Sequence, residues 1–138
     1  MYKFNNRNML LALCAIAEND EKILYPLYGG LGGQSAFNTS ALHNTYGYTA
    51  VTDRNRLVFI RFNAFGMPVD NGSYYLENLV SLKVSKFLKL HTIKASFDVN
   101  GKKKKFWFQA NEVVHGTDFY CQKINLPLFI SALEKFSL

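Results

Sequence analysis

The hydrophobic positions near the N-terminus recur with the spacing of a helix. Leu10, Leu13 and Ala17 form such a series, and acidic residues follow directly after it. Spacings of three and four residues place side chains on one face of an α-helix. We therefore expect a packed helix over residues 6–19, in which Cys14 is a small core residue.

The same segment also resembles a short secretory signal. Lys3 and Arg7 precede the apolar stretch 9–17, and Ala15-Ile16-Ala17 has the small–x–small pattern of a cleavage site. The helical spacing favours the packed helix, and on that interpretation the protein is cytoplasmic. No apolar run approaches the roughly 18–20 residues that a membrane-spanning helix needs, so any membrane association would be peripheral.

From residue 22 the pattern changes to an alternation with a period of about two, which is typical of strands. Clusters of Gly, Asn and Asp separate the alternating runs and predict turns at 29–33, 53–56 and Asp70-Asn71-Gly72. Between these turns we expect strands over residues 22–28, 46–52, 57–65, 73–76 and 79–84.

A hairpin centred on Asn100-Gly101 is the clearest element of the chain, because both residues suit the positive φ of a two-residue turn. Folding the chain there predicts which residues pair across the two strands. The pairs expected to face the core are Ile93–Phe108, Ala95–Phe106, Phe97–Lys104 and Val99–Lys102. Lys102 and Lys104 must therefore either lie beyond the end of the core or extend their side chains out of it to reach solvent. The pairs expected on the outer face are Lys94–Trp107, Ser96–Lys105 and Asp98–Lys103. Lys94 over Trp107 predicts a cation–π contact.

A second helix is expected at the C-terminal end. Asn125 is the expected N-cap, and Pro127 fits the first turn. One stripe of this helix is apolar and consists of Leu126, Phe129, Ile130, Leu133 and Phe136. Such a helix is suited to closing one end of a small, bent sheet or barrel.

Composition places the chain among globular proteins. It has 138 residues, of which 49% are hydrophobic and 19% charged, which is enough to build one core. The net charge of +6 is concentrated in one segment: residues 83–105 contain eight lysines and the single acid Asp98, whereas residues 1–82 carry six basic and six acidic residues. Such a segment attracts phosphates or an anionic membrane, or it keeps an edge strand soluble.

Two short stretches resemble the bacterial pleckstrin-homology-like (PH-like) domains, relatives of the GRAM and PH folds. The first joins Tyr48-Thr49-Ala50-Val51-Thr52 through the turn Asp53-Arg54-Asn55 to Arg56-Leu57-Val58-Phe59-Ile60, and the second spans residues 75–84. The resemblance covers roughly residues 20–138. It implies a strongly bent, seven-stranded antiparallel sheet or barrel capped by the C-terminal helix. It also implies a binding or assembly module over 21–138, preceded by a helical extension over 1–20.

The expected loop after the first strand departs from the family pattern. Phosphoinositide-binding PH domains place Lys and Arg in and beside this loop, but residues 23–52 contain no Asp, Glu, Lys or Arg. An uncharged loop is suited to packing on another protein or on a second copy of the chain. An ordinary loop with scattered apolar residues is the other interpretation. The candidate interaction residues are Leu31, Phe37, Leu42, His43 and Tyr46.

Catalytic motifs are absent from the sequence. His43, His91 and His115 lie far apart, and none has a carboxylate or cysteine at a metal-ligand spacing. The hairpin register places His91 on the outward side, and His115 falls in a loop. No phosphate-binding Gly-Lys-Ser/Thr occurs, and the Gly30–Gly32 pair lacks the third glycine of a dinucleotide motif. We therefore expect a non-enzymatic protein with no cofactor and no metal.

Three functions from different classes remain. The first, which the sequence favours, is protein–protein contact or self-association through the uncharged loop, with the N-terminal helix as a second candidate surface. The alternative is peripheral binding to an anionic membrane surface through the Lys83–Lys105 segment, with Lys94, Lys102, Lys103, Lys104, Lys105 and Trp107 as the candidate patch. Nucleic acid is the least favoured partner of these lysines, because no recognised DNA- or RNA-binding motif accompanies them.

Overall fold

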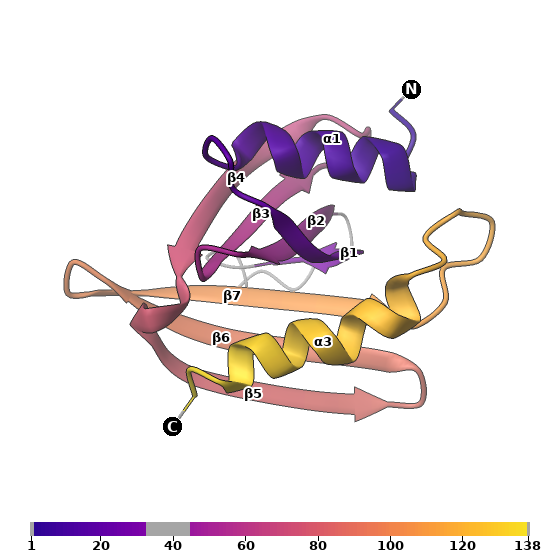
Figure 1. Cartoon of the computed structure of the whole chain (residues 1–138). Coiled ribbons are helices and arrows are strands. Elements are labelled where there is room, and N and C mark those ends of the chain that lie inside the picture. Colours follow the sequence, from indigo (N-terminus) through magenta and orange to yellow (C-terminus); the bar gives the residue numbers. More distant parts are fainter. Residues whose placement is uncertain (1, 33–44, 138) are drawn as a thin grey trace.

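A computed structural model describes residues 2–32 and 45–137. Within these residues, two α-helices flank a run of seven strands (Figure 1). The elements in chain order are α1 (Asn6–Ile16), β1 (Ile23–Leu31), β2 (Tyr46–Thr52), β3 (Arg56–Phe62), β4 (Pro68–Tyr75), the 3₁₀ turn η2 (Leu76–Asn78), β5 (Leu79–Phe87), β6 (Leu90–Val99), β7 (Lys102–Asn111) and α3 (Gln122–Glu134).

The strands form one antiparallel sheet in the order β4-β3-β2-β1-β7-β6-β5. Among the described residues, β1 and β7 pair at Gly30–Gln109 and Leu31–Phe108, and the Gly32 N–H donates to the Trp107 carbonyl oxygen at 2.7 Å. This short seam joins two halves of the sheet, β1–β4 and β5–β7. The sheet is open, with β4 and β5 at its edges. The fold class expected from the sequence, a mostly-β chain with a seven-stranded antiparallel sheet and a C-terminal helix, is confirmed.

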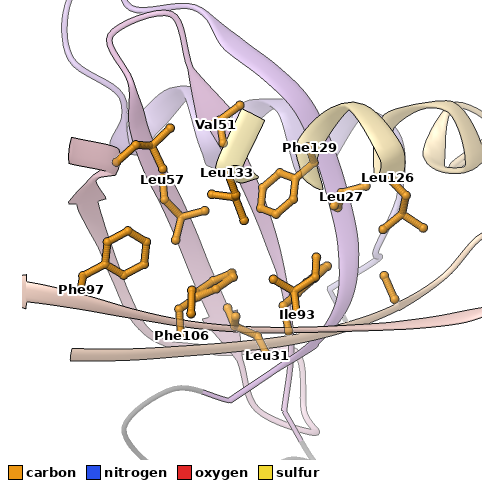
Figure 2. Packing of buried hydrophobic residues seen from close by; sticks show 14 residues of the cluster. Leu27, Leu31, Val51, Leu57, Ile93, Phe97, Phe106, Leu126, Phe129 and Leu133 are labelled. Carbon is orange, nitrogen blue, oxygen red and sulfur yellow. The ribbon is translucent and has the colours of Figure 1, made fainter. Parts of the chain in front are cut away.

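The main core lies between the two halves of the sheet and α3. The buried stripe of α3 consists of Leu126, Phe129 and Leu133. Figure 2 shows Phe129 and Leu126 on the side of Leu27, and Leu133 on the side of Val51 and Leu57. Complete burial of one such side chain contributes about 1.5–3 kcal/mol. The expected apolar stripe is therefore confirmed, with Ile130 and Phe136 packed at its margin.

A second core holds α1 against the other side of β1–β3. Met9 and Leu13 are buried against a cluster that includes Tyr48 and Phe62. The helix is three residues shorter at its C-terminal end than expected, because Ala17 already has extended backbone. The prediction for Cys14 is wrong, since its side chain is exposed: the buried stripe runs through Met9 and Leu13, and Cys14 lies outside it.

The predicted Asp70-Asn71-Gly72 turn is wrong, because these residues lie inside β4. Gly72 pairs with Phe59, and a Cβ at Gly72 would lie 2.9 Å from the Phe59 ring. The glycine therefore serves a close approach between strands rather than a turn. Likewise Gly29 lies inside β1 and does not end it. A Cβ at this position would collide with the carbonyl oxygen of Gln109 in β7, so this glycine also serves a close approach between strands.

The last helix begins at Gln122, three residues before the expected cap Asn125. The buried Gln122 amide accepts a hydrogen bond from the Tyr28 N–H and donates to the carbonyl oxygens of Tyr28 and Asn111, each at 2.8 Å. Asn125 donates its side-chain N–H to the Pro26 carbonyl oxygen instead of capping the helix. Contacts with β1 and β7, which sequence periodicity does not reveal, thus set where α3 begins.

Neither helix of the described residues is long and apolar enough to span a lipid bilayer.

Candidate functional site

The β6–β7 hairpin supports a row of outward-facing lysines. Asn100 and Gly101 both have positive φ, 55° and 81°, which fits a tight two-residue turn. The ladder contains every predicted pair, including Lys94–Trp107, Ser96–Lys105 and Asp98–Lys103 on the outer face. The register predicted from the sequence is therefore confirmed.

Strand β5 extends this outer face by one more lysine. Lys83 pairs with Lys94, which in turn pairs with Trp107, and Ser81 pairs with Ser96 in the neighbouring row. Residues on this side of the strands face away from the core that contains Ile93 and Phe106. We call this surface the basic face and define it by its outward residues Lys83, Lys94, Lys103, Lys105, Trp107, Ser81, Ser96 and Asp98.

The remaining two candidate lysines lie elsewhere. Lys102 and Lys104 have the parity of the core positions, as expected: Lys102 pairs with Val99 next to the turn, and Lys104 pairs with the buried Phe97. Lys102 is exposed, whereas Lys104 is half-buried in a hollow that Arg61 and Asp70 also line. The candidate patch is thus divided: Lys94, Lys103, Lys105 and Trp107 share the basic face, and Lys102 and Lys104 do not.

Trp107 lies beneath one of these lysines. The Lys94 ammonium nitrogen is 4.5 Å from the centroid of the Trp107 ring, which confirms the predicted cation–π contact. At an exposed site such a contact contributes about 0.5–1 kcal/mol. The Nε1–H of Trp107 is buried and has no hydrogen-bond acceptor among the described residues. The ring therefore serves as a support for Lys94 rather than as a free stacking surface.

Small residues next to Lys94 and Trp107 leave a shallow hollow in the basic face. Its volume is about 530 Å³, and it is lined by the side chains of Ser81, Ser96, Lys83, Lys94, Lys105 and Trp107, among others. Hydroxyl and ammonium groups around an open hollow can donate hydrogen bonds to phosphate or carboxylate oxygens. The arrangement suits an anionic partner.

The carboxylate of Glu112 is directed to the opposite side of this hairpin. It accepts a hydrogen bond from His91 Nε2 at 2.9 Å and pairs with Lys86 at 3.2 Å. The hydrogen bond from His91 and then that from Lys86 lower the pKa of Glu112 below its ordinary value. The predicted outward position of His91 is wrong, since His91 pairs with buried Ala110 and shares the parity of Ile93. The Glu112 carboxylate therefore pairs with Lys86 and His91 on the inner side of the hairpin and does not neutralise the basic face.

The β5–β6 hairpin carries residues that the sequence analysis missed. Its strands continue to the pair Phe87–Leu90, beyond the expected end at residue 84, and the turn residues are Leu88 and Lys89. Phe87 is 76% exposed and Leu88 is 79% exposed. The sequence signal was present as three apolar residues, 87, 88 and 90, among Lys83, Lys86 and Lys89.

The uncharged-loop candidates are only partly described. Phe37, Leu42 and His43 lie outside the described residues. Leu31 belongs to β1 and is buried in the main core, so the prediction that it contacts a partner is wrong. Tyr46 begins β2 and is 41% exposed, with its ring stacked on that of Tyr28 at a centroid distance of 6.2 Å. Protein contact or self-association through this loop stays a prediction.

A buried ion pair elsewhere serves the fold. Arg56 donates to both carboxylate oxygens of Glu21, at 2.9 and 2.6 Å, and Thr52 donates to the same carboxylate at 2.5 Å. The hydrogen bonds from Arg56, more than those from Thr52, lower the pKa of Glu21 to about 2. Every donor comes from β2 or β3, so this network fastens the segment before β1 to the sheet.

The described residues contain no group of three or more His, Cys, Asp or Glu side chains that could hold a metal ion. Cys14 and Cys121 are exposed thiols, and His115 is exposed in the segment before α3. Comparisons with protein-family models, with curated proteins and with solved structures found no match for this chain.

Proposed function

We propose that this protein is a non-enzymatic binding module that docks on an anionic membrane surface through the basic face. The observation that carries the proposal is the grouping of Lys83, Lys94, Lys103 and Lys105 on one side of three adjacent strands, with Asp98 as the sole acid of that face. Among the described residues, Lys83, Lys94 and Lys103 form no ion pair. Their charge is therefore available to a partner.

The size of the electrostatic term supports a weak, reversible interaction. A lysine close to an anionic leaflet contributes about 1 kcal/mol, so Lys83, Lys94 and Lys103 contribute about 3 kcal/mol. That free energy corresponds to a dissociation constant of about 6 mM. Charge alone thus concentrates the protein near the surface, and firm docking requires an additional apolar contribution.

The resemblance to PH-like domains supports a binding module but not the same binding site. The described parts of residues 23–52, which are β1 and β2 with their flanks, carry no charged side chain. The charged surface of this chain lies instead on β5–β7, in the other half of the sheet.

A membrane fits this face better than nucleic acid does. Binding of single-stranded nucleic acid relies on aromatic rings whose faces are free for base stacking. The ring of Trp107 is occupied by the Lys94 ammonium group, so it offers little stacking surface on that side.

Vesicle co-sedimentation tests this function. Wild-type protein is expected to pellet with vesicles containing phosphatidylglycerol and to remain in the supernatant with neutral phosphatidylcholine vesicles. The pelleted fraction should fall steeply as salt rises, because the Debye length shortens. The triple variant Lys83→Ser, Lys94→Ser, Lys103→Ser should lose binding.

A matched control removes the same charge elsewhere. Lys3, Lys22 and Lys135 are exposed, lie outside the basic face and form no ion pair among the described residues. The variant Lys3→Ser, Lys22→Ser, Lys135→Ser should retain most of the binding. Equal loss in both triple variants, or wild-type protein that never pellets with anionic vesicles, would contradict the proposal.

A further inference from the structure

The tip of the β5–β6 hairpin exposes large apolar side chains that do nothing for the fold. Phe87 and Leu88 stand at the end of the two strands and belong to neither core cluster. The inward positions nearest the tip are Lys86 and His91, which are polar, so the core has already ended there. Burial in the folded monomer therefore does not explain the choice of Phe and Leu.

The backbone of Leu88 makes this choice more notable. Its φ is 56°, in the left-handed region that Gly, Asn and Asp adopt most readily. The turn at the other end of β6 follows that preference with Asn100 and Gly101. A leucine in this conformation is less favourable for the fold than asparagine. A strained apolar residue facing solvent indicates a role outside folding.

Positive charge surrounds the tip. Lys89 follows Leu88 in the turn, and Lys83 lies four residues before Phe87 on the same side of β5. Of the three lysines Lys83, Lys86 and Lys89, Lys86 forms an ion pair, with Glu112. Apolar side chains at a projecting tip, with lysines set back from them, match the layering of a membrane surface, in which anionic headgroups cover an acyl interior.

The segment before α3 brings further apolar surface to the same end of the molecule. The Glu112 N–H donates to the Lys89 carbonyl oxygen at 3.1 Å, which places this segment beside the tip. Figure 1 shows the β5–β6 turn and the start of α3 at the same end of the sheet. Tyr120 and Ile124 of this region are strongly exposed. Tyrosine is well suited to the boundary between headgroups and acyl chains.

We propose that Phe87 and Leu88 insert into the acyl boundary of an anionic bilayer while Lys83 and Lys89 remain at the headgroups. The inference rests on the proposed function and supplies the apolar contribution that the lysines lack. The basic face and the tip then act together, because Phe87 lies on the same side of β5 as Lys83.

The chain contains its own comparison site. Phe65, in the turn between β3 and β4, is 75% exposed and therefore matches Phe87 in exposure. No lysine occurs between residues 23 and 82, and Arg61, the nearest cation in sequence, pairs with Asp70 at 2.7 Å. Tyr2 packs beside Gly66 of this turn, and the exposed Lys3 is the lysine that follows Tyr2 there. Apolar exposure with so little positive charge beside it is not expected to insert.

Single-tryptophan fluorescence tests the insertion. The variants Phe87→Trp/Trp107→Phe and Phe65→Trp/Trp107→Phe each carry one tryptophan, because the wild-type chain has only Trp107. Both are mixed with phosphatidylglycerol vesicles whose acyl chains are brominated. We expect a blue shift and strong quenching for position 87, and no change for position 65.

Co-sedimentation of a tip variant completes the test. The double variant Phe87→Ser/Leu88→Asn should bind anionic vesicles at least tenfold more weakly, as about 1.4 kcal/mol of lost apolar burial already implies. Phe65→Ser should bind like wild type, and a thermal unfolding midpoint no lower than wild type's shows that the tip variant is folded.

The outcomes separate the two proposals. If wild-type protein binds anionic vesicles and position 87 is neither shifted nor quenched, the insertion is wrong and docking by the basic face stands. If quenching is equal at positions 65 and 87, the tip is not specific and the inference also fails. If wild-type protein binds no anionic vesicle but retains a protein or a nucleic acid, the proposed function itself is wrong.

Discussion

The two turns of the β5–β7 half obey different requirements. At Asn100-Gly101 the residue types suit the positive φ of both turn positions, and buried aromatic residues follow closely on each side. At Leu88-Lys89 a leucine occupies positive φ, and the flanking Phe87 is in solvent. One turn is optimised for folding, whereas the other sacrifices some stability. The difference separates residues that the fold requires from residues that are free to serve binding.

The largest expected effect on stability compares the same substitution, Phe→Ala, at a buried position and at an exposed position of the β5–β7 half. Phe97→Ala removes a fully buried ring that stacks on Tyr74 and should cost about 3–5 kcal/mol of unfolding free energy. Phe87→Ala should change stability by no more than about 0.5 kcal/mol. Urea unfolding of both variants measures the contrast. A loss above about 1 kcal/mol for Phe87→Ala would show that the tip is packed after all.

A smaller effect extends the comparison to acidic residues. The pKa of Glu21 is about 2 in the folded protein and 4.5 ordinarily, so the pair with Arg56 stabilises the fold fully above pH 4.5. This stability, on the order of 2–3 kcal/mol, is lost as the pH falls through 4.5 towards 2. Unfolding free energies at pH 6, 4 and 3 should therefore decline less steeply in Glu21→Gln than in wild type.

Glu77→Gln provides the control, because Glu77 is exposed on η2 and forms no ion pair among the described residues. It should keep the wild-type dependence on pH. Parallel curves for wild type and Glu21→Gln would mean that the buried pair does not govern stability in acid.

The smallest effect exchanges the chemistry of the two turns. Leu88→Asn should stabilise the protein by about 0.5–1 kcal/mol, since asparagine adopts positive φ more readily than leucine. Asn100→Leu should destabilise it by a similar amount. Thermal unfolding midpoints, compared with wild type, measure both shifts. Stabilisation by Leu88→Asn together with weaker vesicle binding would show directly that the tip trades stability for function, whereas destabilisation would break the comparison.

The same contrast explains what could be predicted from the sequence. The β6–β7 register, and with it the outward positions of Lys94, Lys103, Lys105 and Trp107, follows from a turn whose residue types specify its geometry. The addition of Lys83 depends on the Leu88-Lys89 turn and on an irregularity between Leu79 and Ser81. Neither feature has a local sequence signature, so the full basic face was not predictable.

Long-range contacts account for the other differences. Gly72 resembles a turn residue in sequence, and only the neighbouring Phe59 ring shows why it lies in a strand. The start of α3 depends on Gln122, whose partners are 94 and 11 residues away in the chain. Cys14 lies within an apolar run that offers two helical stripes, and packing against Tyr48 and Phe62 selects the stripe of Met9 and Leu13 instead.

The Gln122 side chain also determines how the molecule comes apart. Among the described residues, backbone pairing between β1 and β7 consists of two residue pairs and the hydrogen bond from the Gly32 N–H to the Trp107 carbonyl oxygen, so the shared main core supplies most of the contact between the halves of the sheet. The amide of Gln122 bonds to Tyr28 of β1 and to Asn111 of β7 from the first turn of α3. Separating β1 from β7 would therefore leave the buried Gln122 amide without some of its hydrogen-bond partners and would also detach the start of α3. We therefore expect the two half-sheets to unfold as one cooperative unit, joined by the shared core and by this glutamine.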